Sequence, residues 1–120
     1  MKQYGLIGKH LSHSFSKEYF EKKFEKEGIT GRKYDLYEID NCAELPNLIK
    51  SIEHFCGFNV TIPFKQEVMQ FLDYVDPAAA TIGAVNTVKI SQNDATLSGF
   101  NTDYYGFKAS IKPFLAQHHE

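Results

Sequence analysis

The sequence is poor in several residues and patterns that mark particular classes of protein. It contains no tryptophan and only two cysteines in 120 residues. The cysteines lack metal-ligand spacing, which favours two reduced thiols of a cytoplasmic protein over a disulfide. No apolar run approaches the roughly 20 residues that cross a bilayer, and the N-terminus lacks the apolar core of a signal peptide. These features predict a cytoplasmic protein without a membrane partner.

Charge of one sign is also lacking. Lysine and arginine total 13 and aspartate and glutamate 15, so the net charge is −2 and the pI is near 6.2. A chain without a basic stripe is not expected to bind nucleic acid or an anionic membrane surface. Its length suits one compact domain over residues 1–120, which can bury roughly two thirds of its unfolded surface.

Three strands alternate with three helices along the first two thirds of the chain. Strands are predicted over residues 4–8, 34–39 and 57–62. The helices are predicted from an aromatic stripe that ends near Gly28, and over residues 43–52 and 63–74. Residues 76–80 suit a turn or short helix, 84–90 and 96–100 a hairpin, and 102–115 a final helix. The order predicts an α/β fold: a three-layer, open, twisted, mainly parallel sheet, with helices on both faces and at least one antiparallel strand.

The third predicted strand runs into a proline and a lysine. Pro63 suits the first position of a helix, which would place Lys65 in the first helical turn. The positive end of a helix dipole would favour release of a proton from a lysine there. Asn59 and Thr61 share one face of the strand, so the segment resembles a polar site at a strand's carboxyl end. An ordinary surface lysine is the alternative.

Other polar residues also stand where strands meet helices. Ser14 and Ser16 precede the first helix, where they suit either N-capping or a carboxylate or phosphate site. Asn86 interrupts an apolar strand, which implies a hydrogen-bond network or a ligand. Asp103 suits a stabilising first-turn acid, or an acid–base couple with Lys65 if both lie at one edge of the sheet.

Four motifs in a fixed order cover the chain: Ser-Phe-Ser at 14–16, Asn-Val-Thr-Ile-Pro-Phe-Lys at 59–65, Gly-Ala-Val-Asn-Thr at 83–87 and Gly-Phe-Asn-Thr-Asp-Tyr-Tyr-Gly at 99–106. In these motifs the chain resembles the N-terminal, substrate-binding and catalytic domain of the shikimate dehydrogenases. The resemblance implies a carboxylate site at Ser14 and Ser16, and a catalytic pair at Lys65 and Asp103. It also implies that the ring hydroxyls contact Asn59, Thr61, Asn86 and Asp103. Lys17 departs from the family, which commonly has proline after the second serine.

A glycine-rich dinucleotide turn is absent. Family members continue into a nucleotide-binding domain, whereas this chain has no G-x-G-x-x-G pattern after a strand. The resemblance implies reversible reduction of 3-dehydroshikimate to shikimate with NADPH, in chorismate and aromatic amino-acid biosynthesis. NADP would be bound by the missing C-terminal domain, so no cofactor and no metal is expected on residues 1–120, and the fragment alone should be inactive.

Two alternatives to this function remain open. One is a quinate/shikimate dehydrogenase that uses NAD. The other is a non-catalytic module that binds a small polyhydroxy acid. All three take a small molecule as partner, and the sequence carries no signal for an oligomeric state.

Overall fold

The computed structural model describes residues 2–11 and 16–102, so the predicted helix over 102–115 lies outside it except for its first residue. The strands in the described part are β1 (Lys2–Gly8), β2 (Arg32–Glu38), β3 (Phe55–Val60), β4 (Tyr74–Val75), β5 (Thr87–Ile90) and β6 (Leu97–Phe100). The α-helices there are α1 (Ser16–Lys26), α2 (Leu45–Ser51) and α3 (Pro77–Ile82). Two short 3-10 helices are η1 (Cys42–Glu44) and η2 (Glu67–Phe71).

The six strands form one mixed sheet in the order β2-β1-β3-β5-β6-β4. β1 pairs in parallel with β2 and β3, and β4 pairs in parallel with β6. β5 is antiparallel to both of its neighbours, β3 and β6, so it alone among the described strands runs against the rest. The prediction of a mainly parallel sheet with an antiparallel hairpin strand is confirmed.

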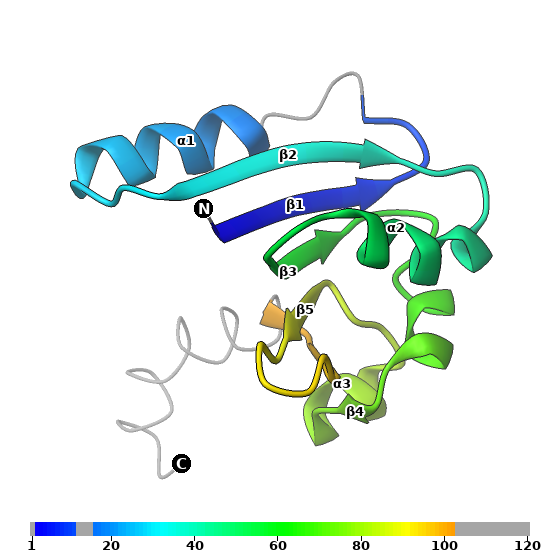
Figure 1. Ribbon diagram of the computed structural model, residues 1–120. Helices are drawn as coiled ribbons and strands as arrows, with labels where there is room; N and C mark the ends of the chain where they lie inside the picture. The colour runs from blue at the N-terminus through cyan, green and yellow to red at the C-terminus, as the bar shows by residue number, and fades with distance from the viewer. Residues whose placement is uncertain (1, 12–15, 103–120) are drawn as a thin grey trace, which may run out of the picture.

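Helices cover both faces of the sheet, which makes three layers (Figure 1). α1 lies on one face, where Phe20 and Phe24 pack against a small core that includes Leu6. Ile7, the next residue of β1, points to the opposite face and joins the larger core. That core takes Leu45 from α2 and Ala79 from α3. Leu6 and Ile7, neighbours on β1, therefore pack against the helical layers on opposite faces of the sheet.

Local capping interactions define several helix ends. Asn41 and Glu44 form a capping box at η1: Ala43 N–H donates to Asn41 Oδ1, and Asn41 N–H donates to Glu44 Oε2, both at 2.9 Å. Pro46 occupies the first turn of α2, where its missing N–H costs no hydrogen bond. Gly28 follows α1 with a φ of 68°, which a glycine adopts without steric cost.

The helix predicted over residues 63–74 is wrong. This segment forms turns and the 3-10 helix η2, and the peptide bond between Ile62 and Pro63 is cis. In an α-helix the Lys65 carbonyl would accept a hydrogen bond from Met69 N–H. Instead it accepts from Val85 N–H at 2.8 Å, and Met69 N–H donates to Gln66 at 3.3 Å. A contact twenty residues away thus replaces the helical bond.

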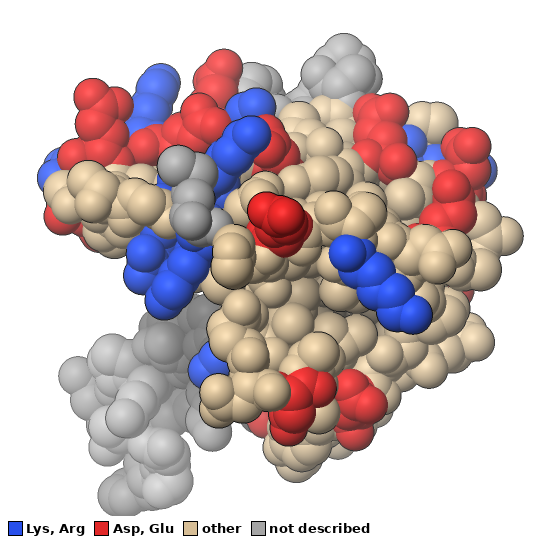
Figure 2. Space-filling view, viewed as in Figure 1, with Lys and Arg blue, Asp and Glu red and all other residues tan. Residues whose placement is uncertain are grey.

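Charged side chains are intermixed over the molecule. Figure 2 shows acidic and basic residues interspersed around α1, while much of the remaining visible face is uncharged. Among the described residues, no helix is long and apolar enough to cross a membrane.

Candidate functional site

Polar residues gather at one edge of the sheet, where β1, β3 and β6 end and β5 begins (Figure 1). Asn59 lies one residue before the end of β3, and Thr87 is the first residue of β5. These two residues are directly paired across the antiparallel ladder. Thr102 comes two residues after β6, whose last residue Phe100 also pairs with Thr87. The topology therefore unites three of the four sequence motifs.

Asn86 lies at the centre of this edge and is only 8% exposed. Its backbone N–H donates to Phe100 at 3.0 Å, and its carbonyl accepts from Val60 N–H at 2.8 Å, so the residue is fixed between two strands. Its side-chain Oδ1 accepts from the N–H of Thr102 at 2.9 Å and from the hydroxyls of Thr102 and Thr87 at 3.2 and 3.1 Å. Within the described residues no acceptor is bonded to Asn86 Nδ2.

Asn59 extends the same network along the sheet. Its Nδ2 donates to the Thr87 hydroxyl at 3.2 Å, and its Oδ1 accepts from the Tyr34 hydroxyl at 3.0 Å. Side chains joined in one chain of hydrogen bonds hold each other in a single arrangement, which lowers the reorganisation needed when a ligand binds.

Thr61 stands just beyond β3, close to the end of β1. Its N–H donates to the Ile7 carbonyl at 3.0 Å. A β-carbon on Gly8 would lie 2.4 Å from Thr61 Cγ2 and 2.8 Å from a Leu11 methyl group. Glycine is therefore needed at position 8 so that Thr61 can approach β1.

We expect Gly8→Ala to lower the free energy of unfolding by about 1–3 kcal/mol, the usual cost of overpacking. It should also weaken ligand binding, because the added methyl group pushes Thr61 away. Urea denaturation would measure the change in stability, and titration with shikimate the change in affinity. Gly28→Ala is the matched control: no atom lies within 4 Å of its β-carbon, so only the positive φ is strained. Equal ligand binding by the Gly8→Ala and wild-type proteins would show that the position of Thr61 does not matter.

Lys65 is held beside Asn86 by the backbone. Its carbonyl accepts from the N–H of Val85, the residue preceding Asn86. The lysine is half-buried. Because no helix begins at Pro63, the expected helix dipole does not act on Lys65. The structure instead places the Lys65 backbone next to the segment that carries Asn86.

Three predicted site residues are not fully described. Ser14 and Asp103 lie outside the described residues, and Ser16 is described only as the first residue of α1. The start of α1 is nevertheless anchored: Lys17 Nζ lies 2.9 Å from Asp35 Oδ1 on β2, and Lys33 Nζ lies 3.2 Å from Asp35 Oδ2. Burial raises the pKa of the Asp35 carboxyl, but the two lysines outweigh burial and hold the pKa below its usual range. Lys17, where the family commonly has proline, thus joins the start of α1 to β2 through an ion pair.

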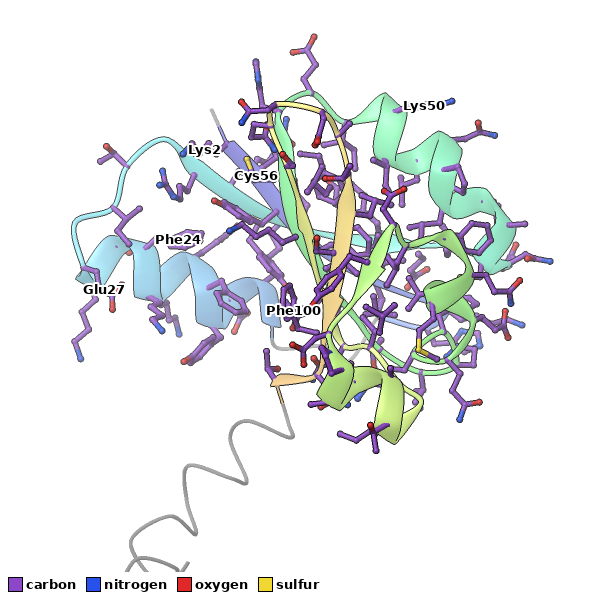
Figure 3. The ribbon with its side chains drawn as sticks, turned by 90° about the horizontal axis from the view of Figure 1, so that it is seen from below. Lys2, Phe24, Glu27, Lys50, Cys56 and Phe100 are labelled. Carbon is purple, nitrogen blue, oxygen red and sulfur yellow. The ribbon has the colours of Figure 1, made fainter. Side chains whose placement is uncertain are left out.

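A groove of about 470 Å³ runs between α1 and the sheet, within the range of ligand pockets, about 300–1,000 Å³. Its polar lining includes Tyr34, Asn59, Thr87 and Thr102. Its apolar lining is largely aromatic, with Phe24 of α1 and Phe100 of β6 among the residues that border it (Figure 3). These four polar residues therefore face a space that a small molecule can enter, whereas Asn86, Thr61 and Lys65 are not among its lining residues.

The described residues do not fit a nicotinamide dinucleotide. A pyrophosphate is usually held by a glycine-rich turn between a strand and a helix N-terminus. Gly8 ends β1, but the space beside it is filled by Thr61 and Leu11. No group of three metal-ligating side chains occurs in the part of the chain that the structure describes.

Fold and site together define a class. The chain is an α/β domain with a network of amides and hydroxyls at the carboxyl ends of its strands, where open α/β sheets place their ligands. Residues 6–88 match the family described as "Shikimate dehydrogenase substrate binding domain". The chain belongs to this family.

Known proteins agree with this assignment over nearly the whole chain. It is 47% identical over 109 residues to the "Shikimate dehydrogenase (NADP(+))" of Clostridium beijerinckii, covering 89% of this chain and 39% of that relative. It resembles the crystal structure of shikimate dehydrogenase 1 from Peptoclostridium difficile with a TM-score of 0.81 and 38% identity, over 93% of this chain and 42% of the other. The Thermus thermophilus enzyme, solved in complex with shikimate, gives a TM-score of 0.79 and 34% identity, over 94% and 42% of the two chains. The chain thus spans about two fifths of the length of these relatives.

Tyr34 is hydrogen-bonded to the candidate site, although the sequence analysis did not identify it. It lies in β2, 25 residues before its partner Asn59, and belongs to none of the four motifs. The predicted strand over residues 34–39 carried a signal, because alternation could have placed Tyr34 and Leu36 on one face. Which face meets Asn59 follows only from the parallel register through β1.

Proposed function

We propose that this chain is the substrate-binding domain of an NADP-dependent shikimate dehydrogenase and that it binds shikimate and 3-dehydroshikimate. The observation that carries the proposal is the fixed Asn86 amide. Three hydrogen bonds from Thr87 and Thr102, which line the groove, hold its oxygen, and we expect its own N–H groups to donate to a ligand oxygen. Shikimate is a ring that bears hydroxyl groups, which such donors suit. The Thermus thermophilus relative, solved with shikimate, supports the same ligand.

The site residues divide the work in this proposal. Asn59, Thr61 and Asn86 would contact the ring hydroxyls, and Ser14 and Ser16 the substrate carboxylate. Lys65 and Asp103 would contact the hydroxyl at the reacting carbon, which becomes a carbonyl on oxidation. One of this pair takes up that hydroxyl's proton, and because the two groups titrate together the couple acts as one unit.

The longer enzyme would supply the other half of the reaction. We propose that a second domain binds NADP and delivers or accepts the hydride, as the name of the Clostridium beijerinckii relative suggests. The proposal also places the protein in the cytoplasm. Cys42 and Cys56 are free thiols, which suits a reducing compartment.

The 120-residue chain should bind shikimate weakly and NADP not at all. Its cores lie within the domain, so we expect it to fold alone. Its substrate site would lack the covering domain, and an open cleft makes fewer contacts and excludes less water. Calorimetric titration with shikimate and with NADP would measure both affinities. An absorbance assay for NADPH should detect no turnover.

Two further ligands should be titrated for comparison with shikimate. The methyl ester of shikimate should bind more weakly than shikimate, because it lacks the charge that the serines would hold. Titration with quinate tests the alternative of a quinate/shikimate dehydrogenase, which quinate binding as tight as shikimate binding would favour. Saturable NADP binding or turnover by the chain would contradict the proposed division of labour. Absence of shikimate binding to the full-length enzyme would contradict the proposed function itself.

A further inference from the structure

Tyr34 connects the helical layer of α1 to the polar edge of the sheet. It is only 2% exposed. Its ring stacks on Phe20 of α1, with 4.6 Å between the ring centroids and 20° between the planes. Its hydroxyl lies 3.0 Å from Asn59 Oδ1. The next residue of β2, Asp35, pairs with Lys17, the second residue of α1. Two consecutive residues of β2 therefore fasten the helix that begins at Ser16.

One backbone N–H determines the direction of every hydrogen bond in the network. The N–H of Thr102 can only donate, so the Asn86 atom 2.9 Å away is an oxygen. The Thr87 hydroxyl donates to that same oxygen, and its own oxygen is then free to accept from Asn59 Nδ2. This arrangement turns Asn59 Oδ1 toward Tyr34.

The remaining bond follows from the orientation of Asn59. An amide oxygen can only accept, so the Tyr34 hydroxyl must be the donor. The direction is thus set along the whole row, from Thr102 through Asn86, Thr87 and Asn59 to Tyr34. Tyr34 holds the Asn59 amide from the side opposite Thr87.

We propose that Tyr34 is a positioning residue of the substrate site, whose hydroxyl orients the Asn59 amide toward the ligand and whose ring keeps α1 in register with that amide. This inference rests on the proposed function. Without the hydroxyl, Asn59 Oδ1 loses its donor, and only the bond from Nδ2 to the Thr87 hydroxyl still holds the amide. The amide plane can then tilt about that bond, which moves its second N–H out of line with the ligand. Tyr34 does not touch the reacting atoms, so it acts through Asn59.

The test is Tyr34→Phe in the full-length enzyme, which removes the hydroxyl and keeps the stacked ring. We expect the Kd and KM for shikimate to rise about tenfold, in keeping with one neutral hydrogen bond, while kcat changes little. Tyr37→Phe is the matched control. It makes the same change on the same strand, but its ring packs against Phe55 in the core of the other face. Its Kd for shikimate should equal that of the wild type.

A double-mutant cycle separates positioning from a general loss of structure. If Tyr34 acts through Asn59, then Tyr34→Phe should add nothing to the Kd of Asn59→Ala. The side-chain amide signals of Asn59 in an NMR spectrum of the ligand-free enzyme should also shift in Tyr34→Phe and stay unchanged in Tyr37→Phe. Additive effects in the cycle, or an unchanged Kd for Tyr34→Phe, would overturn the inference alone. A wild-type enzyme that binds no shikimate would overturn the proposed function as well.

Discussion

Lys65→Ala should lower the kcat of the full-length enzyme about a hundredfold or more, the usual scale for a general acid or base. The backbone of Lys65 is tied to Val85, next to Asn86, so its position is coupled to the centre of the polar edge. In the proposed reaction Lys65 and Asp103 exchange the proton of the reacting hydroxyl. Loss of the amine removes that exchange, whereas the contacts of Asn59 and Asn86 with the substrate stay. Steady-state kinetics should therefore show a large fall in kcat and a smaller change in KM.

Lys65→Arg separates the charge of Lys65 from its proton. Arginine keeps the positive charge but does not give up a proton at any working pH. It should therefore restore substrate affinity without restoring kcat. Lys50→Ala is the control, because Lys50 is exposed on α2, away from the groove (Figure 3). If Lys65→Arg regained wild-type kcat, Lys65 would supply charge only. A Lys65→Ala enzyme with normal kcat and weaker binding would make it a ligand-binding residue.

Local sequence signals were sufficient for most of the fold. α1 was predicted from Phe20 and Phe24, which lie on one face of the helix and pack on the small core, and from Gly28, which follows the last turn. The capping box of Asn41 and Glu44 likewise involves residues three apart. Such features depend on near neighbours, so they can be deduced without knowledge of the rest of the chain.

The errors occurred where a distant partner changes a local preference. Phe64 and Val68 have helical spacing and both are buried, as a helix over residues 63–74 would require. The segment is not an α-helix because Val85 N–H takes the Lys65 carbonyl. β4 was not predicted because it has only two residues and exists through its pairing with β6. A pattern of side chains does not report such long-range hydrogen bonds.

The same distinction applies to the site. Asn86 was identified because a polar residue within an apolar strand needs a partner, and Asn59 because it shares a strand face with Thr61. Their mutual arrangement was not predictable, because it depends on the antiparallel register that places Asn59 opposite Thr87. The roles of Ser14, Ser16, Lys65 and Asp103 were left open by their positions, were made specific by the resemblance, and remain predictions.

Asn86→Leu should lower the free energy of unfolding by about 3 kcal/mol, because burying a donor without a partner costs about 1–3 kcal/mol. The substitution deprives Thr102 N–H and two hydroxyls of the oxygen that accepts from them. Urea denaturation measures this loss. Asn47→Leu, at an exposed position of α2, is the control and should change stability little.

Asn86→Asp distinguishes support of the site from contact with the ligand. Aspartate keeps an oxygen for the same three donors, so the protein should fold with nearly wild-type stability. It replaces the N–H donors with a second oxygen and adds a negative charge near an anionic substrate. Shikimate affinity should therefore fall at least about tenfold, since a donor is lost and two like charges are brought together.

Calorimetry of Asn86→Asp, with Asn47→Asp as the control, measures this fall in affinity. A variant that is stable and binds shikimate as the wild type does would show that the ligand does not use the Asn86 amide. A marked loss of stability in Asn86→Asp would instead show that three donors do not offset the cost of burying a negative charge at this position.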